Sequence, residues 1–154
     1  MTTPARPAKA SIVSGYFNPL HHGHLDLFEA AAARSGYLIV IVNNDEQQLL
    51  KKGRIIQVED IRARIVRALR CVDDVVVSVD NGPGLDRTFD VIRAAYPDTE
   101  LEFCNGGDRS PEGDVLPTAE LAAAQRNAIS LHYGIGGTDK ADSSTRIMAE
   151  LEAR

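Results

Sequence analysis

Three histidines lie within four positions near the start of the chain, at His21, His22 and His24. They occur where a short apolar run gives way to a stretch with helical spacing, and helix starts favour anions because their first backbone N–H groups are unpaired. Imidazole N–H groups at such a place can donate to phosphate oxygens and stabilise the charge of a phosphoryl transition state. Zinc binding is an alternative, but no Cys or further His is near in sequence to complete a tetrahedral shell.

Two glycines flank this histidine loop, and further glycines, hydroxyls and charges follow later apolar runs. Gly15 and Gly23 are placed where the backbone must turn tightly or approach a ligand closely. Lys51 to Arg54 form a basic turn, for which a solvated charge run is the usual explanation and phosphate contact the functional one. Each of these groups is therefore a candidate for ligand contact and also has a purely structural explanation.

The later candidates have the same two explanations. Gly106 and Gly107 would let backbone N–H groups approach a nucleotide, and Asp108 would accept from a ribose hydroxyl, although Gly-Gly-Asp is also common turn chemistry. Ser143, Ser144 and Thr145 are consecutive residues at the start of the last expected helix. Their hydroxyls can bind the β- and γ-phosphates of a triphosphate there, or they can simply cap the helix.

Short apolar runs alternate with amphipathic stretches along the whole chain. The expected strands are residues 10–14, 37–42, 75–79, 101–104 and 129–133, and the expected helices are residues 23–35, 58–70, 85–96, 117–127 and 143–152. This alternation predicts an α/β, Rossmann-like, doubly wound five-stranded parallel sheet with helices on both faces. Such sheets bind ligands at the carboxyl ends of their strands, where the candidate groups above are found. In the second expected helix the apolar residues fall along one stripe, namely Val58, Ile61, Ile65, Val66 and Leu69.

Composition excludes several classes of protein. The chain has 154 residues, 44% of them apolar and 25% charged, as in an ordinary soluble globular domain. We expect a single domain at residues 10–154 after a flexible tail at residues 1–9. A net charge of −5, 5% aromatic residues and no Trp argue against nucleic-acid binding. The longest apolar runs have about six residues, against the roughly 20 of a membrane helix, and no signal peptide is visible, so a cytoplasmic protein is expected. Cys71 and Cys104 are expected to be buried thiols.

The first loop resembles a known signature. Residues 15–24 contain Gly15-x-Phe17-Asn18-x-x-His21-x-Gly23-His24, which is similar to the G-x-F-D-x-x-H-x-G-H motif of the cytidylyltransferase-like nucleotidyltransferase superfamily. The one departure is Asn18, which keeps an acceptor oxygen but lacks the charge of the usual acid. The resemblance implies transfer of a nucleoside monophosphate from a nucleoside triphosphate to a small phosphorylated or phosphonate acceptor, with release of pyrophosphate. It also implies Mg²⁺ bridging the phosphates with few protein ligands, and a homodimer, although no stripe in the sequence identifies an interface.

Later segments extend the resemblance over nearly the whole chain. Asn44-Asp45-Glu46, Lys51 and the segments 60–62 and 70–73 are similar to steps of glycerol-3-phosphate cytidylyltransferases. The Gly-Gly-Asp stretch is similar to one in heptose-phosphate adenylyltransferases, and residues 143–147 are similar to the S-S-T-x-I signature of the superfamily. Where the glycerol-phosphate enzymes carry R-T-x-G before these hydroxyls, Lys140 is the only nearby cation.

The resemblance assigns roles to these residues. His21, His24 and Lys51 are the expected catalytic groups. The expected nucleotide-binding residues are Gly15, Tyr16, Phe17, Gly23, Gly106, Gly107, Asp108, Lys140, Ser143, Ser144 and Thr145. The expected acceptor-binding residues are Asn18, Asp45, Lys52 and Arg62. CTP is favoured as the donor over ATP. The alternatives are an adenylyltransferase that uses ATP on a sugar phosphate and a nucleotide-binding module without turnover.

Overall fold

The computed structural model describes residues 6–106, 118–136 and 149–152. The strands in these ranges are β1 (Lys9–Gly15), β2 (Leu38–Val42), β3 (Asp74–Val77), β4 (Glu100–Cys104) and β5 (Ile129–His132). The helices are α1 (His22–Ser35), α2 (Asp45–Lys52), α3 (Glu59–Arg67), α4 (Asp86–Ala95) and α5 (Thr118–Arg126), and residues 149–152 are also helical. The first part of the expected helix 143–152 lies outside the described residues.

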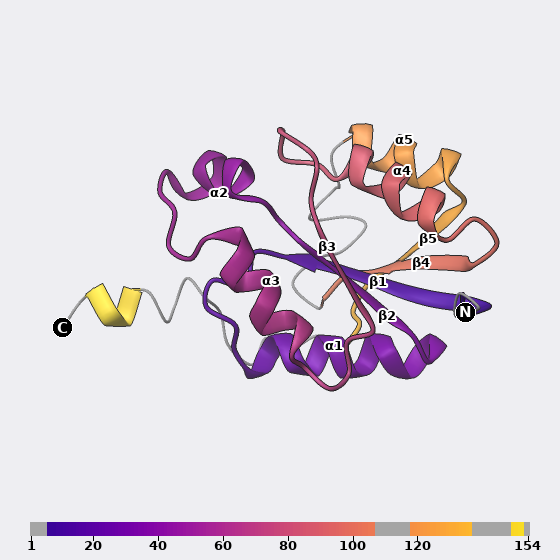
Figure 1. Cartoon of the computed structure of the whole chain (residues 1–154), viewed down its shortest axis with the longest axis horizontal. Helices are drawn as coiled ribbons and strands as arrows, with labels where there is room; N and C mark the ends of the chain where they lie inside the picture. The colour runs from indigo at the N-terminus through magenta and orange to yellow at the C-terminus, as the bar shows by residue number, and fades with distance from the viewer. Residues whose placement is uncertain (1–5, 107–117, 137–148, 153–154) are drawn as a thin grey trace, which may run out of the picture.

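The five strands form one parallel sheet in the order β3-β2-β1-β4-β5. Helices α1 and α3 cover one face and α4 and α5 cover the other, as Figure 1 shows. The predicted doubly wound α/β fold is confirmed. The strand order diverges on the two sides of β1, which places the loop after β1 at the crevice where such sheets bind ligands.

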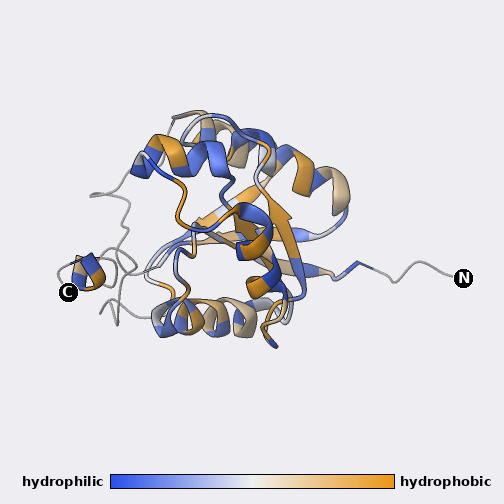
Figure 2. Ribbon diagram, turned by 60° about the vertical axis from the view of Figure 1, so that its left-hand side comes forward, coloured by the Kyte–Doolittle hydropathy of each residue, from blue (hydrophilic) through white to orange (hydrophobic). Residues whose placement is uncertain are grey.

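Two apolar cores form because side chains alternate between the faces of each strand. On β2, Ile39 and Ile41 pack with the residues of α4 and α5, whereas Leu38, Val40 and Val42 pack toward α1 and α3. All five are fully buried, as expected for a central strand covered on both faces. Figure 2 shows the hydrophobic strands between helices whose ribbons alternate between hydrophobic and hydrophilic residues.

The amino-terminal boundary differs slightly from the expectation. β1 begins at Lys9, and the main-chain oxygen of Ala8 accepts a hydrogen bond of 2.8 Å from the N–H of Glu100. The sheet thus extends into the last residues of the segment expected to be a flexible tail.

Helix α2 was not predicted, because residues 45–52 read as a loop that ends in a basic turn. Asn44 caps its first turn: the Asn44 side chain accepts from the N–H of Gln47, and the Gln47 side chain accepts from the N–H of Asn44. Gly53 ends the helix with a φ of 74°, a left-handed conformation that favours glycine. The basic turn is thus the carboxyl-terminal end of a helix, where cations are favoured by the helix dipole.

The apolar stripe predicted on the second helix is only partly buried. In α3 the inner face consists of Arg62, Ala63 and Val66, while Val58, Ile61 and Ile65 are exposed. The helix is also shorter than the predicted 58–70.

Strand β4 carries a buried carboxylate, Glu102, outside the predicted site. It accepts from Ser11 Oγ at 2.8 Å and from Arg34 Nε and an Arg34 terminal nitrogen at 2.8 and 3.1 Å. Burial acts to raise the pKa of Glu102, but the hydrogen bonds from Arg34 and Ser11 and the charges of Arg34 and Lys9 outweigh it, and the pKa falls to about 2. Glu102 therefore remains ionised as part of a structural ion-pair cluster.

The cysteine expectation is confirmed at one position. Cys104 is buried, and its burial, reinforced by the charge of Glu102, raises the pKa of the thiol to about 12. Cys71 is only half-buried. Within the described residues, no helix has the length and apolar character needed to cross a membrane.

Candidate active site

The loop between β1 and α1 is shaped by Gly15 and Phe17. Phe17 has a φ of 55°, and its ring packs edge-on against His24 and Phe28 at centroid distances of 5.0 and 5.2 Å. A Cβ at position 15 would lie 2.8 Å from the Phe17 ring, so this packing requires glycine there. Gly15 and Phe17 thus hold the start of α1, with His24 in its first turn, against the end of β1.

His21 and His24 form a stacked pair at the amino terminus of α1. Their ring centroids are 3.8 Å apart with an interplanar angle of 25°. Nδ1 of His21 accepts from the N–H of Gly23, and Nδ1 of His24 accepts from the N–H of His21, both at 3.1 Å. Because each Nδ1 is an acceptor, a neutral ring must carry its proton on Nε2. The caps that begin the helix therefore also fix two imidazoles as Nε2–H donors beside its positive end.

Helix α2 brings the lysines toward the same loop. Nζ of Lys51 lies 4.7 Å from the centroid of the Tyr16 ring, a cation–π contact. Lys52 is half-buried, and its pKa is lowered because burial disfavours the charged amine and because Lys51, Arg62 and Arg54 are also positive. An anion bound here would relieve this repulsion.

A buried polar network joins the first loop to α2 and to the segment before α3. Asn18 donates through Nδ2 to Oε1 of Gln48, and its Oδ1 accepts from the N–H of Gln57 at 3.1 Å. Gln48 also accepts from the N–H of Ile56 and donates to Asp45 and to the main-chain oxygen of Gln57. Gln48 was not predicted, since nothing in the apolar pattern distinguishes it from an exposed glutamine.

Arg62 is buried at the centre of three loops. Its guanidinium donates to the main-chain oxygens of Tyr16, Asn43 and Gln57 at 3.0, 2.6 and 2.8 Å, and to Oδ1 of Asp45 at 2.9 Å. In this arrangement Arg62 and Asp45 position the loops that carry the histidines and lysines. Contact of either residue with an acceptor stays a prediction.

The other predicted residues are only partly covered by the structure. Gly23 lies in the first turn of α1, and Gly106 follows β4 and is half-buried. Gly107, Asp108, Lys140, Ser143, Ser144 and Thr145 lie outside the described residues. The structure thus brings together the groups after β1 and β2, and the expected triphosphate contacts stay predictions.

The described residues do not fit a protein-built metal cage. No group of three or more His, Cys, Asp or Glu side chains in these ranges could hold a metal ion. Oδ1 of Asn18 and Nδ1 of both loop histidines already accept main-chain N–H groups.

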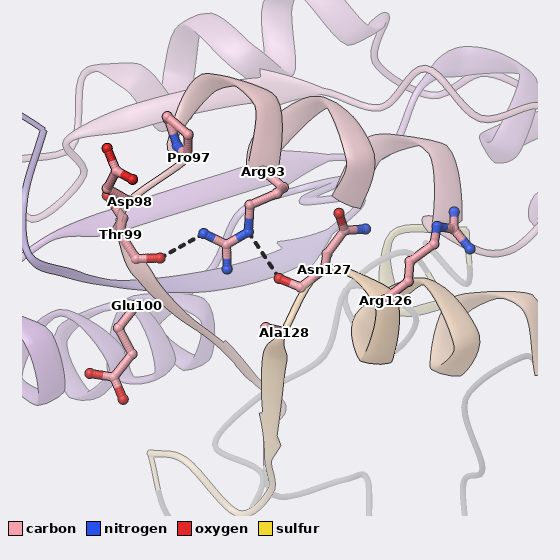
Figure 3. Close-up of a pocket in the computed structure, with 8 residues that line it drawn as sticks. All are labelled: Arg93, Pro97, Asp98, Thr99, Glu100, Arg126, Asn127 and Ala128. Carbon is pink, nitrogen blue, oxygen red and sulfur yellow. Dashed lines mark hydrogen bonds between the residues drawn. The ribbon is translucent and has the colours of Figure 1, made fainter.

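A hollow of about 520 Å³ lies at the opposite end of the sheet, beside the start of β4 and the segment before β5. Figure 3 shows Arg93 at its centre, donating to the main-chain oxygens of Thr99 and Asn127 at 2.7 and 2.9 Å. These bonds tie the end of α4 to the turn after α5. None of the predicted site residues lines this hollow, which lies at the amino-terminal ends of β4 and β5.

Two curated proteins are similar to parts of this chain. The bifunctional protein HldE of Gluconobacter oxydans (strain 621H) is 39% identical over 93 residues, which cover 59% of this chain and 18% of that protein. The FAD synthase of Pyrococcus abyssi (strain GE5 / Orsay) is 40% identical over 89 residues, covering 56% of this chain and 57% of that protein. The chain thus spans less than two thirds of the length of either relative.

A solved structure and a family model agree with the fold and the motif. The lipopolysaccharide core biosynthesis protein from Thermoplasma volcanium GSS1 superimposes with a TM-score of 0.59 at 20% identity, covering 87% of this chain and 98% of that chain, a likeness of fold. The family model described as cytidylyltransferase-like matches residues 12–129, which include the histidine loop and α2. The chain therefore belongs to the cytidylyltransferase-like family of nucleotidyltransferases.

Proposed function

We propose that this chain transfers a nucleoside monophosphate from a nucleoside triphosphate to a small phosphorylated acceptor and releases pyrophosphate. The observation that carries the proposal is the stacked pair of His21 and His24, each with Nδ1 committed to a main-chain N–H at the start of α1. Two Nε2–H donors beside a helix amino terminus suit the charge that develops on a phosphorus under attack.

The roles of the other residues follow from the chemistry of the acceptor. A phosphate oxygen is already ionised near neutral pH, so no general base is needed and catalysis consists of positioning and charge stabilisation. In this proposal Lys51 and Lys52 balance the charge of the acceptor and of the α-phosphate. Ser143, Ser144 and Thr145, with Lys140, hold the leaving pyrophosphate, and Gly106, Gly107 and Asp108 bind the nucleoside. Mg²⁺ held by the phosphate oxygens would neutralise part of their charge, and the described residues would supply no ligand set of their own.

Among the possible donors, ATP is at least as well supported as CTP, so the expected preference for CTP is not supported by the comparisons. The similarity to an FAD synthase supports ATP, because making FAD adds an adenylyl group to a flavin phosphate. The spacing from Asp45 to Lys51, similar to that in glycerol-3-phosphate cytidylyltransferases, keeps CTP as the second candidate.

Pyrophosphate release tests the proposal directly. The purified chain is incubated with Mg²⁺, one of ATP, CTP, GTP or UTP, and one of a sugar 1-phosphate, glycerol 3-phosphate or FMN. We expect acceptor-dependent pyrophosphate release with ATP or CTP. A thermal shift with nucleotide but no release in any mixture would instead support a binding module without turnover. Without a nucleotide-dependent thermal shift or release, the proposal is wrong.

A further inference from the structure

Asn105 ties the end of β4 to the end of β5. Its N–H and its side-chain Nδ2 both donate to the main-chain oxygen of His132, at 2.8 and 3.1 Å. Its own main-chain oxygen accepts from the N–H of Ile135 at 3.0 Å. Asn105 is also buried. Three hydrogen bonds therefore fix the residue that precedes Gly106, the last described residue after β4 and one that is expected to bind the nucleotide.

Residues 133–136, which we call the β5 turn, lead from the end of β5 to α1. Ile135 and Leu27 of α1 both pack against the apolar core on that face of the sheet. Gly134 and Gly136 have φ angles of 70° and 84°, in the left-handed region that favours glycine. The hydrogen bond from Ile135 to Asn105 therefore joins the end of β4 to a turn that lies on α1.

Gly136 contacts the backbone of α1 directly. A Cβ at position 136 would lie 3.2 and 3.3 Å from Cα and N of Leu27 and 3.4 Å from the main-chain carbonyl carbon of Asp26. The two shorter distances are below the separation of about 3.5–4.0 Å that non-bonded carbon atoms prefer, so a side chain here would push α1 away. Leu27 lies about one helical turn after His24. The contact therefore bears on the part of α1 that carries the histidine pair.

We propose that Asn105 and Gly136 are positioning residues that hold the end of β4 at a fixed distance from the pair of His21 and His24. The inference rests on the proposed function, which takes Gly106 as a nucleotide contact and the two imidazoles as donors to the phosphoryl group. In this arrangement neither positioning residue touches the substrate. Asn105 holds the β5 turn, and Gly136 sets the distance from that turn to α1. A misplacement of about 1 Å can cost about 100-fold in rate, so a small shift of α1 lowers kcat more than it raises KM.

Gly136→Ala tests the contact with α1 in the full chain, and Gly134→Ala is its matched control. Both substitutions place Ala at a positive φ, but no atom of the described residues lies within 4 Å of a Cβ at position 134. Gly136→Ala is expected to lower kcat for pyrophosphate release about 10-fold or more and to change KM for the nucleotide less than about 3-fold. Gly134→Ala carries similar backbone strain and should keep kcat within about 3-fold of wild type. An equal loss of kcat in the two variants overturns the proposal.

NMR signals of the histidine rings separate this inference from the proposed function. The signals of His21 and His24 are recorded without nucleotide, so they do not depend on turnover. We expect them to shift in Gly136→Ala and to keep their wild-type positions in Gly134→Ala. If this pattern is found in a chain that releases no pyrophosphate, the proposed function fails and the link between the β5 turn and the histidines stands. Ring signals that are unchanged in Gly136→Ala overturn the link.

Asn105→Leu tests the other end of the link and does not depend on the folding of Gly136→Ala. The substitution removes the Nδ2 donor to His132, keeps a side chain of similar size and adds no charge near the phosphates. It is expected to lower kcat about 5-fold or more and to shift the histidine ring signals. Asn127→Leu is the control, since Nδ2 of Asn127 also donates to a main-chain oxygen, that of Ala123 at 2.9 Å, at the opposite end of the sheet. If Asn127→Leu lowers kcat as much as Asn105→Leu does, Asn105 has no positioning role.

Discussion

The side-chain amide of Asn18 donates a hydrogen bond to Oε1 of Gln48, and both side chains are buried. Main-chain groups fix this direction. The N–H of Ile56 donates to the same Oε1, and the N–H of Gln57 donates to Oδ1 of Asn18. Because both outer partners are donors, Asn18 must present its NH₂ to Gln48. A carboxylate at position 18 would place one of its oxygens against Oε1 of Gln48. Gln48 therefore suits the asparagine that stands here in place of the family's usual acid.

Asn18→Asp is therefore expected to destabilise the fold. The change removes the donor and places a buried charge beside an acceptor, which costs about 1–3 kcal/mol in the free energy of unfolding. Urea denaturation at neutral pH measures the loss. Gln125→Glu, an amide-to-acid change at an exposed position on α5, is the control and should stay within about 0.5 kcal/mol of wild type. Equal stability of Asn18→Asp and wild type would contradict the proposed hydrogen-bond direction.

His21 caps α1 and, in the proposed function, also donates its Nε2–H to phosphate, and the choice of substitution separates these two roles. His21→Ala removes both the cap of α1 and the Nε2–H donor, so it should lose about 1 kcal/mol of stability as well as activity. Asn is a preferred cap residue, so His21→Asn should keep the stability of wild type and still lower kcat by about 100-fold or more. Thermal unfolding and steady-state kinetics check the two effects. A His21→Asn variant with near-normal turnover would remove the imidazole from the mechanism.

Lys51 is expected to act through its charge, held in place by the Tyr16 ring. Lys51→Met should lower kcat/KM by about 100-fold, because a charge-assisted contact to phosphate is lost. Tyr16→Leu removes the cation–π contact together with the hydroxyl that donates to the main-chain oxygen of Gln47 at 3.4 Å, and it should lower kcat/KM about 2- to 5-fold. Tyr16→Phe keeps the ring and serves as the control. If Tyr16→Phe lowers kcat/KM as much as Tyr16→Leu does, the aromatic ring does not position Lys51.

Glu102 should give a distinct acid dependence of stability. Its pKa of about 2 in the folded protein lies below the ordinary value of 4.5. The stabilisation it provides is therefore present above pH 4.5 and is lost as the pH falls toward 2. The contribution is about 2–3 kcal/mol, given that Glu102 is buried but Arg34 is partly exposed.

Glu102→Gln isolates this dependence from that of other carboxylates. The variant should be less stable than wild type at pH 7, and the difference in unfolding free energy should shrink as the pH falls below 4.5. Denaturant unfolding at a series of pH values measures it. A constant difference across that range would show that Glu102 does not carry the acid dependence.

The sequence predicted the sheet well because β2 and its neighbours are continuous apolar runs. It predicted the histidine pair because a local motif holds both residues. It missed α2 because Asp45–Lys52 is mostly polar, and the helix depends on the cap at Asn44 and on two buried glutamines, Gln47 and Gln48. Burial of these amides requires partners from distant segments, which spacing along the chain does not reveal.

The same limit applies to α3. The spacing of Val58, Ile61 and Ile65 correctly predicts a stripe on a helix, but spacing cannot distinguish a stripe that faces the sheet from one that faces outward. Here the inward position is taken by Arg62, whose partners are main-chain oxygens of three separate loops. A buried arginine of this kind follows only from the assembled fold.

The partners of Arg62 have a consequence for how such a site can change over evolution. Tyr16, Asn43 and Gln57 offer it backbone oxygens and not side chains. Mutations at these three positions therefore leave the hydrogen bonds of Arg62 intact as long as the path of the backbone is kept. The loops can acquire new side chains, and with them new substrates, while the hydrogen bonds from Arg62 that hold the loops together stay the same.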